Sequence, residues 1–205
     1  MDEFSKKLIV GVTRAMFNHL YVPKYHAHNQ CLRWAGLTRY VFLAFQNRGL
    51  IDKTLCPLIQ AGTAQWRYKS GEDDDDCYFS YSFNQEDLMR HLDRGTGENV
   101  EWHVWLGIRE TNEIVDLTTP HQPKQLADTA INLPRNTQWE REHALPDFIW
   151  HEAHTAFDAG WQYLPHELAC AVATNTWANT IKVHDLQTPS DLSRLFAYCL
   201  ATFRP

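Results

Sequence analysis

Three residues of the sequence, Cys31, His103 and Asp116, have side chains that together could perform acyl-transfer chemistry. In such a trio a thiolate attacks a carbonyl carbon and an imidazole carries the proton, while a carboxylate holds the imidazole in one tautomer and stabilises its cationic form. A purely structural interpretation competes with this one, because a cysteine at a helix start is often only a small buried hydrophobic residue. The choice depends on whether the chain brings the three side chains together.

Cys31 begins the most hydrophobic helical segment, which we predict from residue 31 to about Gly49. Asn29 is a favourable N-cap, which would place Gln30 and Cys31 in the first helical turn. Unpartnered backbone N–H groups and the positive end of the helix dipole lie there, and both favour a thiolate. The same N–H groups can donate to an oxyanion, with Gln30 and Asn29 as candidates for further donors. Trp34, one turn later, is a candidate for a cleft wall or for the core.

His103 lies in a predicted strand over residues 101–108, EWHVWLGI. Strand alternation puts His103 and Trp105 on one face, and the residues between and around them on the other. That other face is wholly apolar, so we expect it to pack on the helices: Trp102, Val104, Leu106 and Ile108. Trp105 indicates that the face of His103 is covered as well and makes Trp105 a second candidate for a cleft.

Asp116 lies in the next predicted strand, residues 112–119, after a polar turn. If Ile108 pairs with Glu113, residue 105 lies opposite residue 116, and Asp116 then shares a face with His103. Aspartate is disfavoured in strands and costly beside apolar neighbours. A carboxylate that accepts a hydrogen bond from an imidazole would explain its presence.

This chain order resembles that of the transglutaminase-like branch of the papain-like cysteine-enzyme superfamily. The matching residues are Cys31 in NQCLRWAG, His103 in EWHVWLGI and Asp116 in EIVDLTTP, and the resemblance covers about residues 25–120. It implies a central helix that bears the nucleophile and packs on an antiparallel sheet. It also implies a cysteine-dependent hydrolase or acyl transferase without a cofactor, acting on a peptide, a protein or a small amide.

Two alternatives stay open beside this activity. Arylamine N-acetyltransferases, a neighbouring branch, use the same trio with acetyl-CoA. Some members of the superfamily have lost catalysis and only bind, so the chain could be an idle scaffold on the same fold. We favour hydrolysis, because nothing in the sequence indicates a site for a second substrate.

Other histidines are weaker candidates. The stretch WHEAHTAFDAG is not a zincin motif, because Thr155 stands where the second histidine is needed. The stretch also holds Glu152 and Asp158, and if His151 and His154 share a helix face, His143 or His166 could complete a metal site with them. A polar surface or hydrogen-bonding cluster is the favoured interpretation. His26 and His28 precede Cys31 in a predicted loop, which holds a base less well than a strand does.

Composition restricts the class of protein. The chain has 205 residues, of which 44% are apolar and 21% charged, as in soluble globular proteins. A net charge of −6 argues against binding to duplex nucleic acid. No apolar run is long enough to span a membrane, and MDEFSKK lacks the order of a secretory signal. Five cysteines without a CxxC pair indicate reduced thiols, so we expect a cytoplasmic protein.

The remaining elements predict one α+β domain, with a core over about residues 25–120 and a helical carboxy-terminal extension over about 121–205. Helical spacing marks residues 4–20, 124–131, 165–181 and 190–203. Strand composition marks residues 63–70 and 77–83. The acidic run EDDDD at 72–76 fits a solvated hairpin loop rather than a calcium site.

Overall fold

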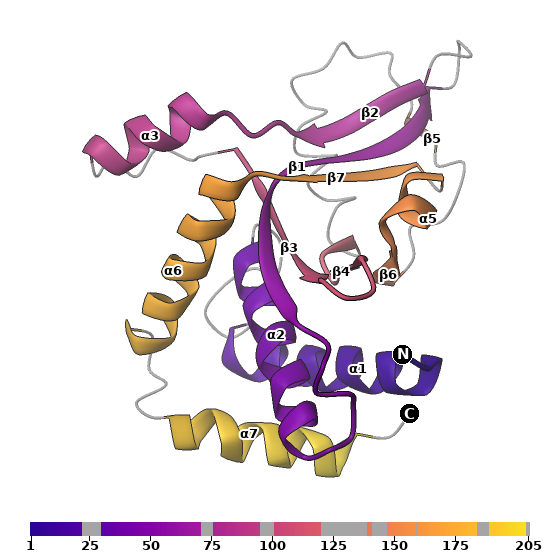
Figure 1. Cartoon of the computed structure of the whole chain (residues 1–205), viewed down its shortest axis with the longest axis vertical. Helices are drawn as coiled ribbons and strands as arrows, with labels where there is room; N and C mark the ends of the chain where they lie inside the picture. The colour runs from indigo at the N-terminus through magenta and orange to yellow at the C-terminus, as the bar shows by residue number, and fades with distance from the viewer. Residues whose placement is uncertain are drawn as a thin grey trace.

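A computed structural model describes the chain in eight parts, residues 1–21, 30–70, 76–94, 101–119, 139–140, 147–158, 160–183 and 189–203. These residues form an α+β fold in which helices pack around an antiparallel sheet (Figure 1). The predicted α+β class is therefore confirmed. No helix within these ranges is long and apolar enough to cross a membrane.

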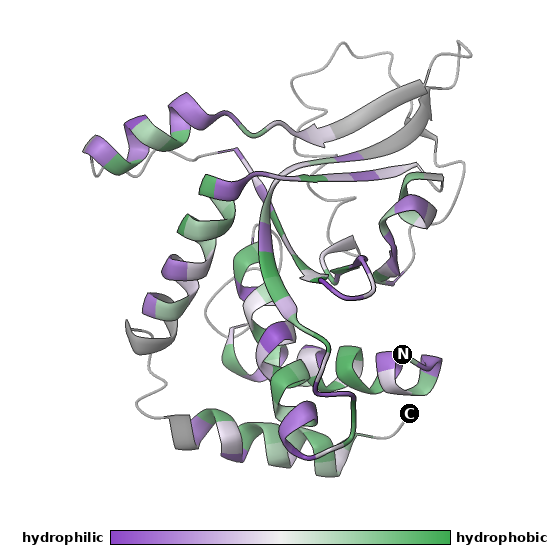
Figure 2. Ribbon diagram, in the orientation of Figure 1, coloured by the Kyte–Doolittle hydropathy of each residue, from purple (hydrophilic) through white to green (hydrophobic). Residues whose placement is uncertain are grey.

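Two helices build most of the core on one side of the sheet. Helix α1 (Glu3–Leu20) begins at Asp2, whose carboxylate caps it by accepting from the backbone N–H of Ser5 at 2.8 Å. Helix α2 (Cys31–Asn47) packs against α1 and against the sheet, and Figure 2 shows apolar residues running along both helices. Two later helices, α6 (Glu167–Val183) and α7 (Pro189–Thr202), complete this side (Figure 1).

The sheet has its described strands in the order β2–β1–β3–β4–β6, with β5 and β7 also paired to β1. Strand β1 (Pro57–Ser70) is long and has different partners in its two halves. Residues 57–62 pair with β3 (His103–Ile108), and residues 62–70 pair with β2 (Asp76–Tyr81), β5 (Trp139–Glu140) and β7 (Trp161–Pro165). Strand β4 (Glu113–Asp116) connects β3 to β6 (Ile149–Glu152).

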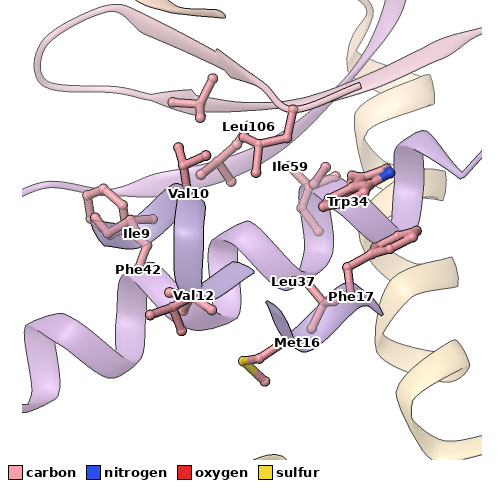
Figure 3. Packing of buried hydrophobic residues seen from close by; sticks show 14 of the residues in the cluster. Ile9, Val10, Val12, Met16, Phe17, Trp34, Leu37, Phe42, Ile59 and Leu106 are labelled. Carbon is pink, nitrogen blue, oxygen red and sulfur yellow. The ribbon is translucent and has the colours of Figure 1, made fainter. Parts of the chain in front are cut away.

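The pairing of β3 with β4 has the register that the sequence predicts. Ile108 lies opposite Glu113, and Leu106 lies opposite Val115. The even-numbered residues of β3, Val104 and Leu106 among them, join the core beneath the helices (Figure 3). Trp105 instead joins a smaller apolar cluster with Tyr163, on the other face. Both faces of β3 are thus covered, as predicted.

Several sequence predictions need correction. The helix that carries Cys31 has Gln30 as its N-cap, so Gln30 lies outside the first turn. The carboxy-terminal part is not only helical, because β5, β6 and β7 join the sheet and α5 (Ala153–Asp158) lies between the last two. The predicted helix at 124–131 and the loop at 71–75 fall outside the described residues. Strand β1 also begins at Pro57 instead of residue 63.

Helix α3 (Gln85–Arg94) was absent from the prediction. The segment is polar overall, but Leu88 and Leu92 have helical spacing, a signal that the prediction missed. Its start carries a second signal: the side chain of Asn84 accepts from the backbone N–H of Glu86 at 2.9 Å, and acidic residues occupy the first turn.

Candidate functional site

The structure brings His103 and Asp116 together in the interior. His103 is the first residue of β3 and Asp116 the last of β4, and both side chains lie on the face opposite the helical core. The imidazole Nε2 is 2.8 Å from Oδ2 of the carboxylate. Only 3% of His103 and 2% of Asp116 is exposed, so water does not compete for this bond.

Asp116 accepts three further hydrogen bonds. The backbone N–H of Thr118 donates to Oδ1 at 2.8 Å, and the Thr118 hydroxyl donates to the same oxygen at 2.6 Å. The Tyr163 hydroxyl donates to Oδ2 at 2.8 Å. Burial would raise the pKa of Asp116, but the charge of His103 and the bonds from His103 and Thr118 outweigh it and hold that pKa below its usual value. The carboxyl group is therefore a carboxylate at neutral pH.

Cys31 completes a chain of contacts with His103. Its thiol, half-buried at the start of α2, lies near enough to the imidazole to act on its charge. Burial disfavours the imidazolium, yet the Asp116 carboxylate, together with a smaller effect of Cys31, raises the pKa of His103 to about 10. Because Asp116 takes Nε2, the ring nitrogen left for Cys31 is Nδ1. The three predicted residues thus form one connected group.

Aromatic rings enclose the imidazole. Tyr81 stacks on it with ring centroids 5.3 Å apart and an interplanar angle of 12°. Trp105 lies 6.2 Å away, and its indole N–H donates to the Gln60 side chain at 2.8 Å. Trp105 is 1% exposed, so it packs beside His103 in the interior and does not line a cleft. This packing limits rotation of the imidazole.

The start of α2 holds the candidate oxyanion donors. Gln30 makes no side-chain cap bond, and its Oε1 accepts from Nη1 of Arg33. Arg33 in turn lies over the ring of Tyr21, 5.4 Å from its centroid. With the oxygen of Gln30 engaged, the donors that this residue offers are those of its amide nitrogen. Asn29, His26 and His28 fall outside the described residues.

Trp34 belongs to the core. It is 4% exposed and stacks on Phe17 with centroids 3.6 Å apart and an interplanar angle of 3° (Figure 3). Of the two interpretations of Trp34, core packing accounts for this position.

The histidines near residue 151 do not form a shared helix face. His151 lies in β6, where its ring stacks with that of Trp161. His154 lies in α5, and its Nδ1 is 3.3 Å from Oε2 of Glu152. His166 precedes α6, and His143 falls outside the described residues. Within the ranges that the structure describes, no group of three or more His, Cys, Asp or Glu residues is arranged to hold a metal ion.

Sequence reasoning missed two residues of the site, Thr118 and Tyr163. A signal existed for Thr118, because an aspartate often accepts from the backbone two residues later. No local signal marks Tyr163, which reaches Asp116 from a strand 47 residues further along the chain.

Comparison with known proteins adds little. The sequence matches no protein-family model and no curated protein. One crystal structure, described only as that of a genomics target, is similar over 100% of this chain and 80% of its own, with a TM-score of 0.43 and 12% identity. A likeness so distant carries no argument about fold or function.

Proposed function

We propose that the protein is a cysteine-dependent hydrolase of amides, with Cys31 as nucleophile, His103 as proton carrier and Asp116 as the group that orients it. The observation that carries the proposal is the buried His103–Asp116 hydrogen bond beside the Cys31 thiol, which also acts on the charge of the imidazole. A purely structural histidine and aspartate would have no need of a half-buried thiol at a helix start.

The chemistry follows from these positions. The Cys31 thiolate adds to the carbonyl carbon of an amide, and the carbonyl oxygen takes the negative charge. Backbone N–H groups of the first turn of α2 and the amide nitrogen of Gln30 are the donors for that oxyanion. His103 gives its proton to the leaving nitrogen as the C–N bond breaks, which yields an amine and a thioester. His103 then takes a proton from water, and the hydroxide releases the acid and the thiol.

The same arrangement supports the proposed relation to papain-like enzymes of the transglutaminase type. A helix that begins with the cysteine, followed by a strand with the histidine and a neighbouring strand with the aspartate, is the order that this resemblance implies. Substrates of the proposed class are peptides, proteins and small amides. The test must distinguish hydrolysis from two alternatives. One is acyl transfer, including N-acetyl transfer, and the other is an inactive scaffold.

The test uses p-nitrophenyl acetate as an acylating probe of the whole chain. We expect a burst of p-nitrophenol equal to one acetyl group per chain and a mass increase confined to the peptide of Cys31. Cys31→Ser and His103→Ala should abolish the burst, whereas Cys56→Ser, which removes another half-buried thiol, should keep it.

A second measurement then separates hydrolysis from transfer. If acetyl-Cys31 loses its acetyl group at the same rate in water alone as in the presence of alkyl amines or aryl amines, hydrolysis is supported. Release of ammonia from glutamine peptides would then identify the substrate. A preference for amine acceptors supports transfer. Absence of any burst at Cys31 in the folded protein contradicts the proposal and favours the scaffold.

A further inference from the structure

Two donors share one oxygen of the buried carboxylate. His103 Nε2 and the Tyr163 hydroxyl both lie 2.8 Å from Oδ2 of Asp116. We infer that Tyr163 is a positioning residue of the Cys31–His103–Asp116 group, whose hydroxyl keeps Asp116 charged and fixes the oxygen that orients His103. Its effect on the triad rests on the proposed function, whereas its effect on Asp116 does not.

Tyr163 is held so that its hydroxyl stays on the carboxylate. It lies in β7, opposite Ala64 of β1, and is 8% exposed. Its ring meets Trp105 edge-on, with centroids 5.1 Å apart, and Trp105 is itself anchored on Gln60. A buried tyrosine hydroxyl needs an acceptor, and Oδ2 of Asp116 supplies one.

The Tyr163 hydroxyl restrains the carboxylate at Oδ2, the oxygen that also binds His103. Thr118 holds Oδ1 with two bonds, and Tyr163 holds Oδ2 independently of the imidazole. When His103 releases its Nδ1 proton to a substrate, its Nε2–H stays on Oδ2, and Thr118 and Tyr163 keep the carboxylate from rotating. The imidazole therefore keeps its orientation through the proton transfer.

Tyr163 stabilises the charge of Asp116 without adding a charge of its own. The titratable groups described around this carboxylate are His103 and Tyr163, with Cys31 beyond the imidazole. A neutral donor leaves His103 as the one counter-charge among them, so that the imidazolium stays paired with Asp116. Without the hydroxyl, Oδ2 would lose one of the two donors that the described residues give it, in a buried site.

The experiment measures the carboxyl titration of Asp116 by NMR on the whole chain, with aspartate labelled at Cγ. Tyr163→Phe should raise the pKa of Asp116 by about one unit, since a hydrogen bond to a charged group is worth that much or more. It should also slow alkylation of Cys31 by iodoacetamide by about tenfold, as expected for a slightly misplaced base. Tyr40→Phe, which removes a half-buried hydroxyl from α2, should change neither quantity.

The outcomes separate this inference from the proposed function. An unchanged titration of Asp116 in Tyr163→Phe overturns the inference. If Tyr163→Phe raises the pKa of Asp116 but leaves the alkylation rate of Cys31 unchanged, the positioning role is overturned and Tyr163 has only a structural role. If His103→Ala leaves alkylation of Cys31 unchanged while Tyr163→Phe still shifts Asp116, the proposed function alone has failed.

A second variant covers the case in which Tyr163→Phe does not fold. Incorporation of 3-fluorotyrosine at position 163 keeps the ring and makes the hydroxyl a stronger donor. The pKa of Asp116 should then move down, opposite to the effect of phenylalanine. A titration that does not move contradicts the inference.

Discussion

His103 presents Nε2, and not Nδ1, to Asp116. The carboxylate therefore decides which tautomer the neutral imidazole adopts: Nε2 carries the proton, and Nδ1 is the nitrogen that can accept one from Cys31. In the proposed mechanism, Asp116 thereby sets the proton-transfer role of His103.

Asp116→Asn should fold and lose activity by orders of magnitude, on the order of 10⁴-fold by the serine-enzyme precedent. The backbone N–H of Thr118 can only donate, so the asparagine oxygen must face Thr118 and its NH₂ group must face His103. Nε2 then becomes an acceptor and the proton moves to Nδ1. The measurement is the acetylation burst at Cys31, with circular dichroism to check the fold.

A matched control is Asp52→Asn. Asp52 also accepts from a backbone N–H two residues later, that of Thr54 at 2.8 Å, but it lies exposed away from the triad. It should leave the burst unchanged. Near-full acetylation by the Asp116 variant would mean that Asp116 has only a structural role.

Cys31 should be the fastest-reacting thiol of the native protein. At about pH 6 an ordinary thiol is almost wholly protonated, whereas the imidazole beside Cys31 can take the proton of its thiol in the reaction. Iodoacetamide at that pH, followed by peptide mapping, should label Cys31 well ahead of the other four cysteines. His103→Ala should slow this labelling without unfolding the protein. Equal labelling of several cysteines would contradict the assignment of Cys31 as nucleophile.

The free energy of unfolding should depend on pH through the His103–Asp116 pair. The pKa of His103 rises from an unfolded value of about 6.5 to about 10 in the folded chain. Its stabilising contribution is therefore complete below about pH 6.5 and is lost as the pH rises towards 10. The lowered pKa of Asp116 acts in the opposite direction: its contribution is present above about pH 4 and is lost on acidification.

Urea unfolding at about pH 7 and about pH 9.5 checks the alkaline side. The wild-type chain should lose more stability between these two values than His103→Gln does, because the variant has no imidazolium to lose. Equal losses in both chains would show that the pair does not contribute to the alkaline decline.

Lys6→Met should destabilise the fold by about 2–3 kcal/mol, as breaking a buried ion pair does. Lys6 of α1 lies 3.4 Å from Glu113 of β4, a carboxylate that is 7% exposed. Without the ammonium, Glu113 would keep the Thr111 hydroxyl, at 2.7 Å, as its partner among the described residues. Chemical denaturation measures the loss, and Lys7→Met, which changes an exposed neighbour, should cost little. Adding Glu113→Gln to Lys6→Met should restore part of the stability, and a purely additive double variant would argue against the pair.

Local patterns were sufficient for the centre of the molecule. Alternation in 101–108 and a short polar turn fixed which faces of β3 and β4 meet, so His103 and Asp116 could be predicted as neighbours. The start of the helix at Cys31 followed from an apolar segment bounded by polar residues.

Long-range pairing escaped prediction for a physical reason. Strand β7 reads WQYLP, too short for periodicity to separate it from a loop, and its partner in β1 lies about a hundred residues earlier. The first half of β1, PLIQAG, begins with proline and carries glutamine at a half-buried position. Neither segment shows the polar–apolar alternation of a strand that has one solvated face. Their pairing therefore depends on partners that only the tertiary fold brings together.

The late position of β7 in the chain has a consequence during synthesis on the ribosome. Cys31, His103 and Asp116 emerge well before Tyr163, and until β7 arrives one edge of β1 lacks the partner that covers residues 62–66. A nascent chain of that length holds the reactive groups but not the strand that covers this edge and supplies the last donor to Asp116. The order of translation therefore delays completion of the site until most of the polypeptide has been made, and premature termination before residue 161 should yield an aggregation-prone fragment instead of a smaller folded domain.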